Sequence, residues 1–207
     1  IATSILANSG QACVAGSRVI VAAELAEALA AQLQVLLADI NPGPTWDGTT
    51  TYGPIISEKQ LKRVDSLVQE SIAVGATVLC GGNRLDRPGC FYMPTILTDV
   101  SDKSPAVTEE IFGPVLTVQT FLSDEEDLQI ADHATYGLAA GVFTRDLSRA
   151  HRVVNELEAG TVWVNRYGRS RDHILPTGGY KSSGIGKDLG REAYHANRRS
   201  KSVLIDL

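Results

Sequence analysis

The apolar residues of this chain recur with two periodicities, one typical of helices and one typical of strands. Three segments carry apolar side chains at spacings of three and four residues, which predicts one buried stripe on each of three helices. The stripes are Leu25, Leu29, Leu33, Leu36 and Ile40; Leu61, Val64, Val68 and Ile72; and Leu147, Ala150, Val154 and Leu157. Asp146 can cap the third helix, and Ser57 with Gln60 has the spacing of a capping box before the second.

Short runs rich in β-branched and aromatic residues lie between these helices and predict strands. They cover residues 18–21, 77–80, 95–97, 115–121, 138–144, 161–164 and 202–205. Because strand and helix alternate along most of the chain, we expect an α/β fold with a mostly parallel sheet. Helices should flank both faces of that sheet in three layers, and the C-terminal strand should extend outwards.

Composition narrows the class of protein and of partner. The chain has 207 residues, of which 43% are hydrophobic and 21% charged, as in an ordinary globular protein. The net charge of −5 comes without any unbroken run of five basic residues, which argues against a nucleic-acid partner. No apolar run reaches membrane-spanning length, so we expect no membrane partner either.

Cysteine and histidine usage indicates neither a disulfide framework nor a metal site. Three cysteines lie far apart without a Cys-x-x-Cys pair, and the histidines show no ligand spacing. These residues are Cys13, Cys80 and Cys90, with His133, His151, His173 and His195. A reducing, cytoplasmic compartment is the natural expectation. Since Met93 is the only methionine, Ile1 is not a native start, and we expect a fragment of a longer chain.

Cys13 is the first candidate for chemistry. It lies in a predicted turn between an apolar segment and a strand, and Gly10 and Gly16 bracket it. A nucleophilic thiol must be accessible and must ionise easily, and a turn rich in backbone amides suits both needs. The alternative is that Cys13 is a small buried hydrophobe, as many free cysteines are.

Residues 108–114 combine two carboxylates with an aromatic ring just before a strand. Glu109 or Glu110 could accept two hydrogen bonds from a sugar diol, and Phe112 could pack on a flat heterocycle. A solvated acidic pair and a core phenylalanine are the alternatives. The loop after Asn165 is basic, which fits a solvated face, an anionic substrate or a subunit contact. Its basic residues are Arg166, Arg169, Arg171, Lys181 and Lys187.

Five segments in order resemble the aldehyde dehydrogenase superfamily over nearly the whole chain. They are Asn8-Ser-Gly-Gln-Ala-Cys13 with Gly16-Ser-Arg18, Glu109-Glu-Ile-Phe-Gly-Pro-Val115, Tyr136-Gly-Leu-Ala, Gly160-Thr-Val-Trp-Val-Asn165 and Gly178-Gly-Tyr-Lys-Ser-Ser-Gly-Ile-Gly186. The resemblance implies oxidation of an aldehyde, a small-molecule substrate, to a carboxylic acid, with reduction of NAD or NADP. It implies that Cys13 attacks the carbonyl and passes through a thiohemiacetal and a thioester.

The same resemblance assigns further site residues. Glu110 matches the residue that holds the ribose hydroxyls of the nicotinamide half, and Phe112 matches the ring beside it. Asn165 and the loop after it match the wall of the aldehyde pocket. Thr177 also lies in that wall, where many relatives have phenylalanine, so the substrate preference of those relatives does not transfer. The strand at 202–205 matches the piece that pairs with a neighbouring subunit, which implies a homo-oligomer.

Residues 1–207 are therefore expected to be the catalytic domain alone. The dinucleotide-binding domain, the general base and an asparagine of the oxyanion hole would lie upstream of Ile1, so we expect little or no turnover from this chain by itself. Two alternatives remain open. One is a thiol esterase that uses only acylation and hydrolysis, and the other is a non-catalytic scaffold or assembly domain.

Overall fold

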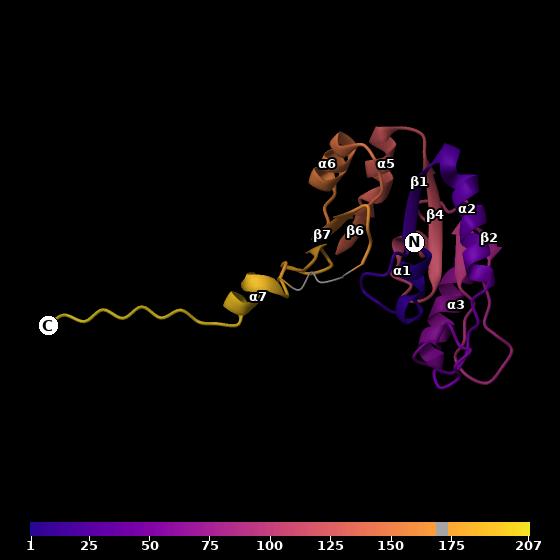
Figure 1. Cartoon of the computed structure of the whole chain (residues 1–207), viewed down its shortest axis with the longest axis horizontal. Helices are drawn as coiled ribbons and strands as arrows, with labels where there is room; N and C mark the ends of the chain where they lie inside the picture. The colour runs from indigo at the N-terminus through magenta and orange to yellow at the C-terminus, as the bar shows by residue number, and fades with distance from the viewer. Residues whose placement is uncertain (169–173) are drawn as a thin grey trace. The chain divides into compact units, whose positions relative to one another are not determined.

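The computed structural model describes residues 1–168 and 174–207 (Figure 1), so Arg169, Arg171 and His173 lie outside it. The chain forms two compact units, residues 1–131 and 132–207. Among the described residues, no helix combines the length and the apolar character that crossing a membrane requires.

A four-stranded sheet organises the first unit, with strand order β1-β4-β3-β2. Strand β4 runs parallel to both β1 and β3, whereas β2 is antiparallel to β3. The strands are β1 (Arg18–Ala22), β2 (Thr77–Cys80), β3 (Thr95–Thr98) and β4 (Val115–Phe121). The helices are α1 (Ala2–Leu6), α2 (Ala23–Ala38), α3 (Glu58–Ala73), α4 (Pro105–Thr108) and α5 (Asp124–Ala131).

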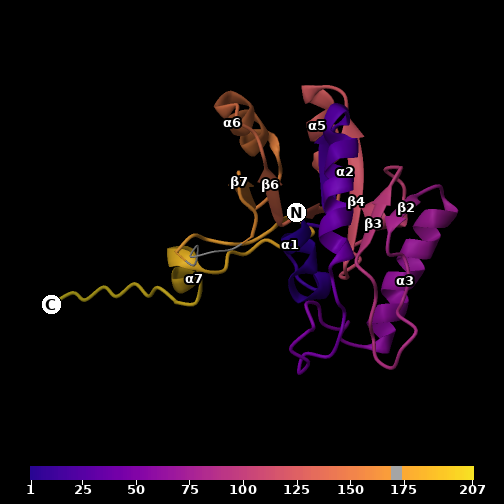
Figure 2. The same cartoon turned by 45° about the vertical axis from the view of Figure 1, so that its right-hand side comes forward.

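Helices cover both faces of this sheet. Successive side chains of a strand point to opposite faces, so each face presents apolar side chains that a helix can bury. In β3, Ile96 packs in one apolar cluster with Leu33 of α2, while Leu97 packs in a second cluster with Val64 of α3. Figure 2 shows the two helices beside the strands. The expected α/β fold, with a mostly parallel sheet flanked by helices, is confirmed.

The predicted stripe on α2 is wrong in part. The helix buries Leu33 and Leu37, whereas Leu25 and Leu36 are 55% and 58% exposed. Residues four apart lie on one face of a helix, so Leu29, Leu33 and Leu37 form the stripe that meets the sheet. The segment is apolar on more than one face, and its periodicity alone therefore did not select the correct one.

The described residues of the second unit form two small sheets. Parallel β6 (Ala139–Val142) and β7 (Thr161–Val164) are joined through α6 (Leu147–Glu156), and Ala150, Val153 and Trp163 are buried there. Antiparallel β5 (Tyr136–Gly137) pairs with β8 (Tyr180–Lys181), and α7 (Gly190–Ala196) follows. Residues 202–205, expected as a strand, carry no regular secondary structure and are exposed. A strand needs a partner edge to satisfy its backbone groups.

Tyr92 gives the first unit a pH dependence. Its side chain is fully buried and donates a hydrogen bond to Asp65 Oδ1 at 3.1 Å. Burial, and then the negative charge of Asp65, raises the pKa of Tyr92. The unfolded chain loses this proton above about pH 10 and the folded chain does not, so the free energy of unfolding should fall by about 1.4 kcal/mol per pH unit there. Urea titrations between pH 9 and 11 should show a shallower fall for Tyr92→Phe, and identical slopes would contradict this.

Candidate active site

Cys13 is exposed, which excludes the buried-hydrophobe alternative. It lies in a tight turn that follows three consecutive residues with positive φ, namely Asn8 at 50°, Ser9 at 58° and Gly10 at 69°. The amide of Gln11 donates to the Asn8 carbonyl at 3.0 Å and closes the preceding turn. Non-glycine residues adopt this conformation only where their surroundings hold them. The turn therefore presents an accessible thiol on a constrained backbone.

The segment at 53–56, which leads into α3, holds this thiol loop in place. The buried hydroxyl of Ser9 donates to the Gly53 carbonyl at 2.9 Å. The carboxamide of Gln11 accepts from the amide of Ile56 at 2.9 Å and donates to the Pro54 carbonyl at 3.5 Å. The loop is thus tied to a part of the chain more than forty positions away.

Glu110 and Phe112 also have exposed side chains, on a short loop before β4. Phe112 is 39% exposed, so the core-phenylalanine alternative is wrong. Glu109, by contrast, pairs with Arg63 of α3 at 3.6 Å. An exposed carboxylate next to an exposed ring is a suitable pair for a sugar diol and a flat heterocycle.

The thiol loop and this second loop are in direct contact. A Cβ atom added to Gly10 would overlap the carbonyl of Gly113, so the two backbones touch where no side chain fits. The first unit therefore brings together two of the segments singled out in the sequence, with Cys13 three residues from one side of the contact and Phe112 adjacent to the other.

Gln60 has a role that the capping-box prediction missed. The Ser57 hydroxyl does accept from the Gln60 amide at 3.3 Å, which is half of the box. The Gln60 side chain does not turn back to the start of α3. Its Nε2 instead donates to the carbonyls of Ile111 and Phe112, each at 3.0 Å. In a capping box the Gln60 side chain would accept from the Ser57 amide, whereas here it donates to two carbonyls that the fold brings close.

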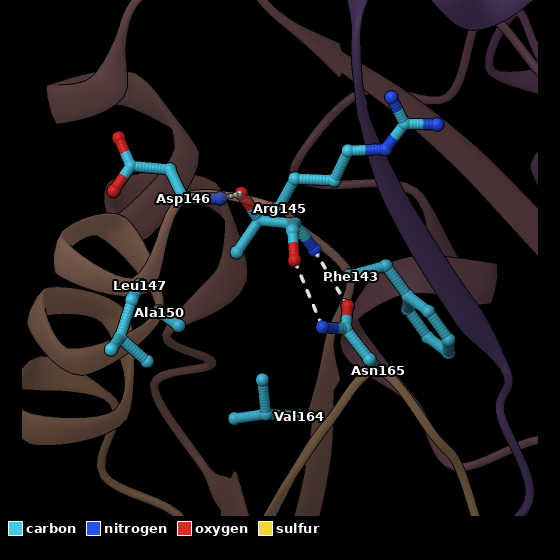
Figure 3. A pocket seen from close by; sticks show the side chains of 8 residues that line it. Phe143, Arg145, Asp146, Leu147, Ala150, Val164 and Asn165 are labelled. Carbon is cyan, nitrogen blue, oxygen red and sulfur yellow. Dashed lines mark hydrogen bonds between the residues drawn. The ribbon is translucent and has the colours of Figure 1, made fainter.

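Asn165 and Thr177 belong to the second unit. The Asn165 carboxamide forms a reciprocal pair with the backbone of Thr144, accepting from its amide and donating to its carbonyl, each at 2.9 Å (Figure 3). Its polar atoms therefore join the ends of β6 and β7. The Thr177 amide donates to the Asp188 carbonyl at 2.6 Å.

A pocket of about 530 Å³ opens beside Asn165 at the ends of β6 and β7. The N-terminus of α6 faces this region, but its first amides already have an anionic partner. Asp146 accepts from the amides of Ser148 and Arg149 at 2.8 and 3.1 Å. The carboxylate of the protein thus occupies the position that an anionic ligand would take.

The basic residue Lys181 is also committed within the fold. Its Nζ lies 2.8 Å from Asp132 and 3.0 Å from Glu158. Partial burial lowers the pKa of Lys181, but hydrogen bonds to these carboxylates outweigh that effect and raise it. Lys181 therefore stabilises the second unit, and the idea that it serves an anionic substrate receives no support.

Thiol accessibility distinguishes Cys13 from Cys80. Cys80 is partly buried, and this burial raises the pKa of its thiol. Because the thiolate is the reactive form, we expect iodoacetamide to alkylate Cys13 at least roughly tenfold faster at pH 7.5. Peptide mass spectrometry of samples quenched over time measures both rates. Equal rates would show that the exposed turn gives Cys13 no advantage.

The model of the "Aldehyde dehydrogenase family" matches residues 1–203. The chain belongs to this family. A betaine aldehyde dehydrogenase from Cereibacter sphaeroides is 41% identical over 200 residues, which cover 97% of this chain and 41% of that protein. This chain therefore spans about two fifths of the length of that relative.

Solved structures of family members are similar as well. An NAD+ complex of an aldehyde dehydrogenase from Bacillus cereus has a TM-score of 0.89 and 43% identity, over 92% of this chain and 39% of that one. A Staphylococcus aureus betaine aldehyde dehydrogenase variant, in complex with NAD+ and with a BME-modified cysteine, has a TM-score of 0.88 and 37% identity. That match covers 94% of this chain and 41% of the other.

Proposed function

We propose that this chain is the catalytic part of an NAD(P)-dependent aldehyde dehydrogenase. The observation that carries the proposal is the exposed thiol of Cys13 on a constrained loop, in backbone contact with the loop that presents Glu110 and Phe112. Membership of the family supports it. Asn165 and Thr177 are proposed to line the aldehyde pocket, although Asn165 would do so while its carboxamide holds Thr144.

Cys13 provides the covalent step. Its thiolate adds to the aldehyde carbonyl carbon, forming a C–S bond, and the oxygen becomes a thiohemiacetal alkoxide that a backbone amide near Cys13 stabilises. Loss of a hydride from this carbon leaves a thioester on Cys13. Water then displaces the thiolate and releases the carboxylic acid, which returns Cys13 to its starting form.

Glu110 and Phe112 would hold the nicotinamide cofactor. These two side chains fit such a group, because an exposed carboxylate accepts hydrogen bonds from a ribose diol and an exposed ring packs against a heterocycle. When bound, the cofactor accepts the hydride. Residues of this chain thus supply the nucleophile and part of the cofactor site, and we expect the general base from the remaining length of the enzyme.

We further propose that residues 202–205 form a strand with a second subunit, giving a homo-oligomer in a reducing, cytoplasmic compartment. Val203, Leu204 and Ile205 are 67%, 90% and 75% exposed, and such β-branched and apolar side chains suit an added strand. Three free cysteines support the reducing compartment.

NADH formation followed at 340 nm tests the main proposal. The enzyme of full family length that contains these residues should oxidise an aldehyde with NAD or NADP, whereas the 207-residue chain should turn over little. Release of nitrophenol from an activated ester by the longer enzyme, without any aldehyde oxidation, would favour the thiol-esterase alternative. If the longer enzyme showed neither activity and Cys13 were unreactive, the scaffold alternative would be favoured.

A further inference from the structure

We propose that Gln60 is a positioning residue, which holds the loop of Glu110 and Phe112 against the thiol loop. The inference deepens the proposed function and rests on it, because it assigns a support to the proposed cofactor site. Gln60 Nε2 donates to two successive carbonyls, those of Ile111 and Phe112. Arg63, one turn further along α3, donates to the preceding carbonyl, that of Glu110, at 3.1 Å.

The loop needs such support because its backbone is strained. Phe112 has φ of 55°, a left-handed conformation that is unfavourable for a non-glycine residue and persists only when neighbouring groups enforce it. The two hydrogen bonds from Gln60 bind the carbonyls of the two peptide groups that flank the Phe112 Cα. They fix both peptide groups, whose orientations determine where the Phe112 side chain points.

Helix α3 is a rigid base for this contact. Its inward residues Leu61, Val64 and Val68 are 0–1% exposed, so the helix is firmly packed in the core. The Val64 side chain also lies against Gly113, where an added Cβ would press on it. Gly113 in turn contacts Gly10. By fixing the loop of Glu110 and Phe112, α3 therefore also constrains the backbone just before Cys13.

Limited proteolysis measures whether Gln60 holds the loop. Gln60→Met keeps the length of the side chain but removes both donors, and Gln60→Lys restores a donor of sufficient reach. Gln69→Met is the matched control, because Gln69 lies on the same helix and donates to a distant carbonyl, that of Gly82, at 3.2 Å. Endoproteinase Glu-C cleaves after Glu109 and Glu110, and cleavage after Glu27 in α2 is the internal reference.

We expect Gln60→Met to speed cleavage in the loop by about 5- to 30-fold relative to the reference site, as expected when one or two hydrogen bonds are lost. Gln69→Met should leave the ratio unchanged, and Gln60→Lys should bring it back toward the wild-type value. A wild-type ratio in Gln60→Met would overturn the proposal. So would an equal rise at both sites, since that would mark a general loss of stability.

A second readout separates positioning from a purely structural role. In the enzyme of full family length, Gln60→Met should raise the KM for NAD(P) by about 5- to 30-fold while changing kcat less, because the support acts on the cofactor loop. An unchanged KM despite faster loop cleavage would overturn the positioning role. The proposed function itself fails on a different result, namely aldehyde oxidation that survives the loss of the Cys13 thiol.

Discussion

Cys13→Ala should abolish aldehyde oxidation in the enzyme of full family length, lowering kcat/KM by on the order of a thousandfold or more. Without the thiol, no bond forms to the aldehyde carbon and no thioester can follow, while the cofactor and pocket residues remain in place. Because Cys13 is exposed, the substitution should change the free energy of unfolding by less than about 0.5 kcal/mol. NADH formation at 340 nm and urea unfolding measure the two effects.

The 207-residue chain allows a direct test of the same thiol. Incubation with p-nitrophenyl acetate should add one acetyl group to Cys13, and this added mass should be absent in Cys13→Ala. Cys80→Ala and Cys90→Ala are matched controls. Both should still gain the acetyl group on Cys13, because the thiols that they remove are only partly accessible. Aldehyde oxidation at the wild-type rate in Cys13→Ala would refute the assigned nucleophile.

Gly10→Ala should destabilise the first unit by about 2–4 kcal/mol, combining about 1 kcal/mol for the left-handed backbone with about 1–3 kcal/mol for overpacking. Gly10 has φ of 69°, and its new Cβ would overlap the carbonyl of Gly113. The atoms that the new Cβ would meet belong to the backbone of Gly113 and Pro114, so they cannot rotate away as a side chain could. The midpoint of urea unfolding measures the loss, and Cys13 alkylation should change with it, since the thiol loop has to shift.

Two other glycines separate the causes of this loss. Gly75 has φ of 112° with no heavy atom within 4 Å of an added Cβ, so Gly75→Ala measures backbone strain alone. Gly48 has equally open space and no positive φ, and Gly48→Ala should be neutral within about 0.5 kcal/mol. If Gly10→Ala proved no more costly than Gly75→Ala, the close contact between the two loops would not exist in solution.

The sequence located the thiol loop and the carboxylate loop because each is a contiguous segment with distinctive residue types. It could not place them together, since Gly10 and Gly113 meet only because the strands that follow them, β1 and β4, are neighbours in the sheet. Gln60 was visible only as a capping residue. Its true partners lie 51 and 52 positions away, and no local spacing encodes them.

Asn165 illustrates the same limit in the second unit. The family resemblance assigns it to the pocket wall, and the structure shows its carboxamide engaged with the backbone of Thr144. The sequence gives no signal for this pair, because the two residues meet only after β6 and β7 align in parallel. Lys181 is similar, since its carboxylate partners come from two other segments of the chain.

By itself, the sequence determined the alternation of helices and strands, the α/β class, and the segments that carry Cys13, Glu110 and Phe112. These depend on periodicity and residue type, which act over a few neighbouring positions. Only the tertiary structure decided which face of α2 is buried and which carbonyls Gln60 binds. A side chain takes its partners from whatever groups the fold brings within hydrogen-bond or van der Waals distance, and long-range packing sets those distances.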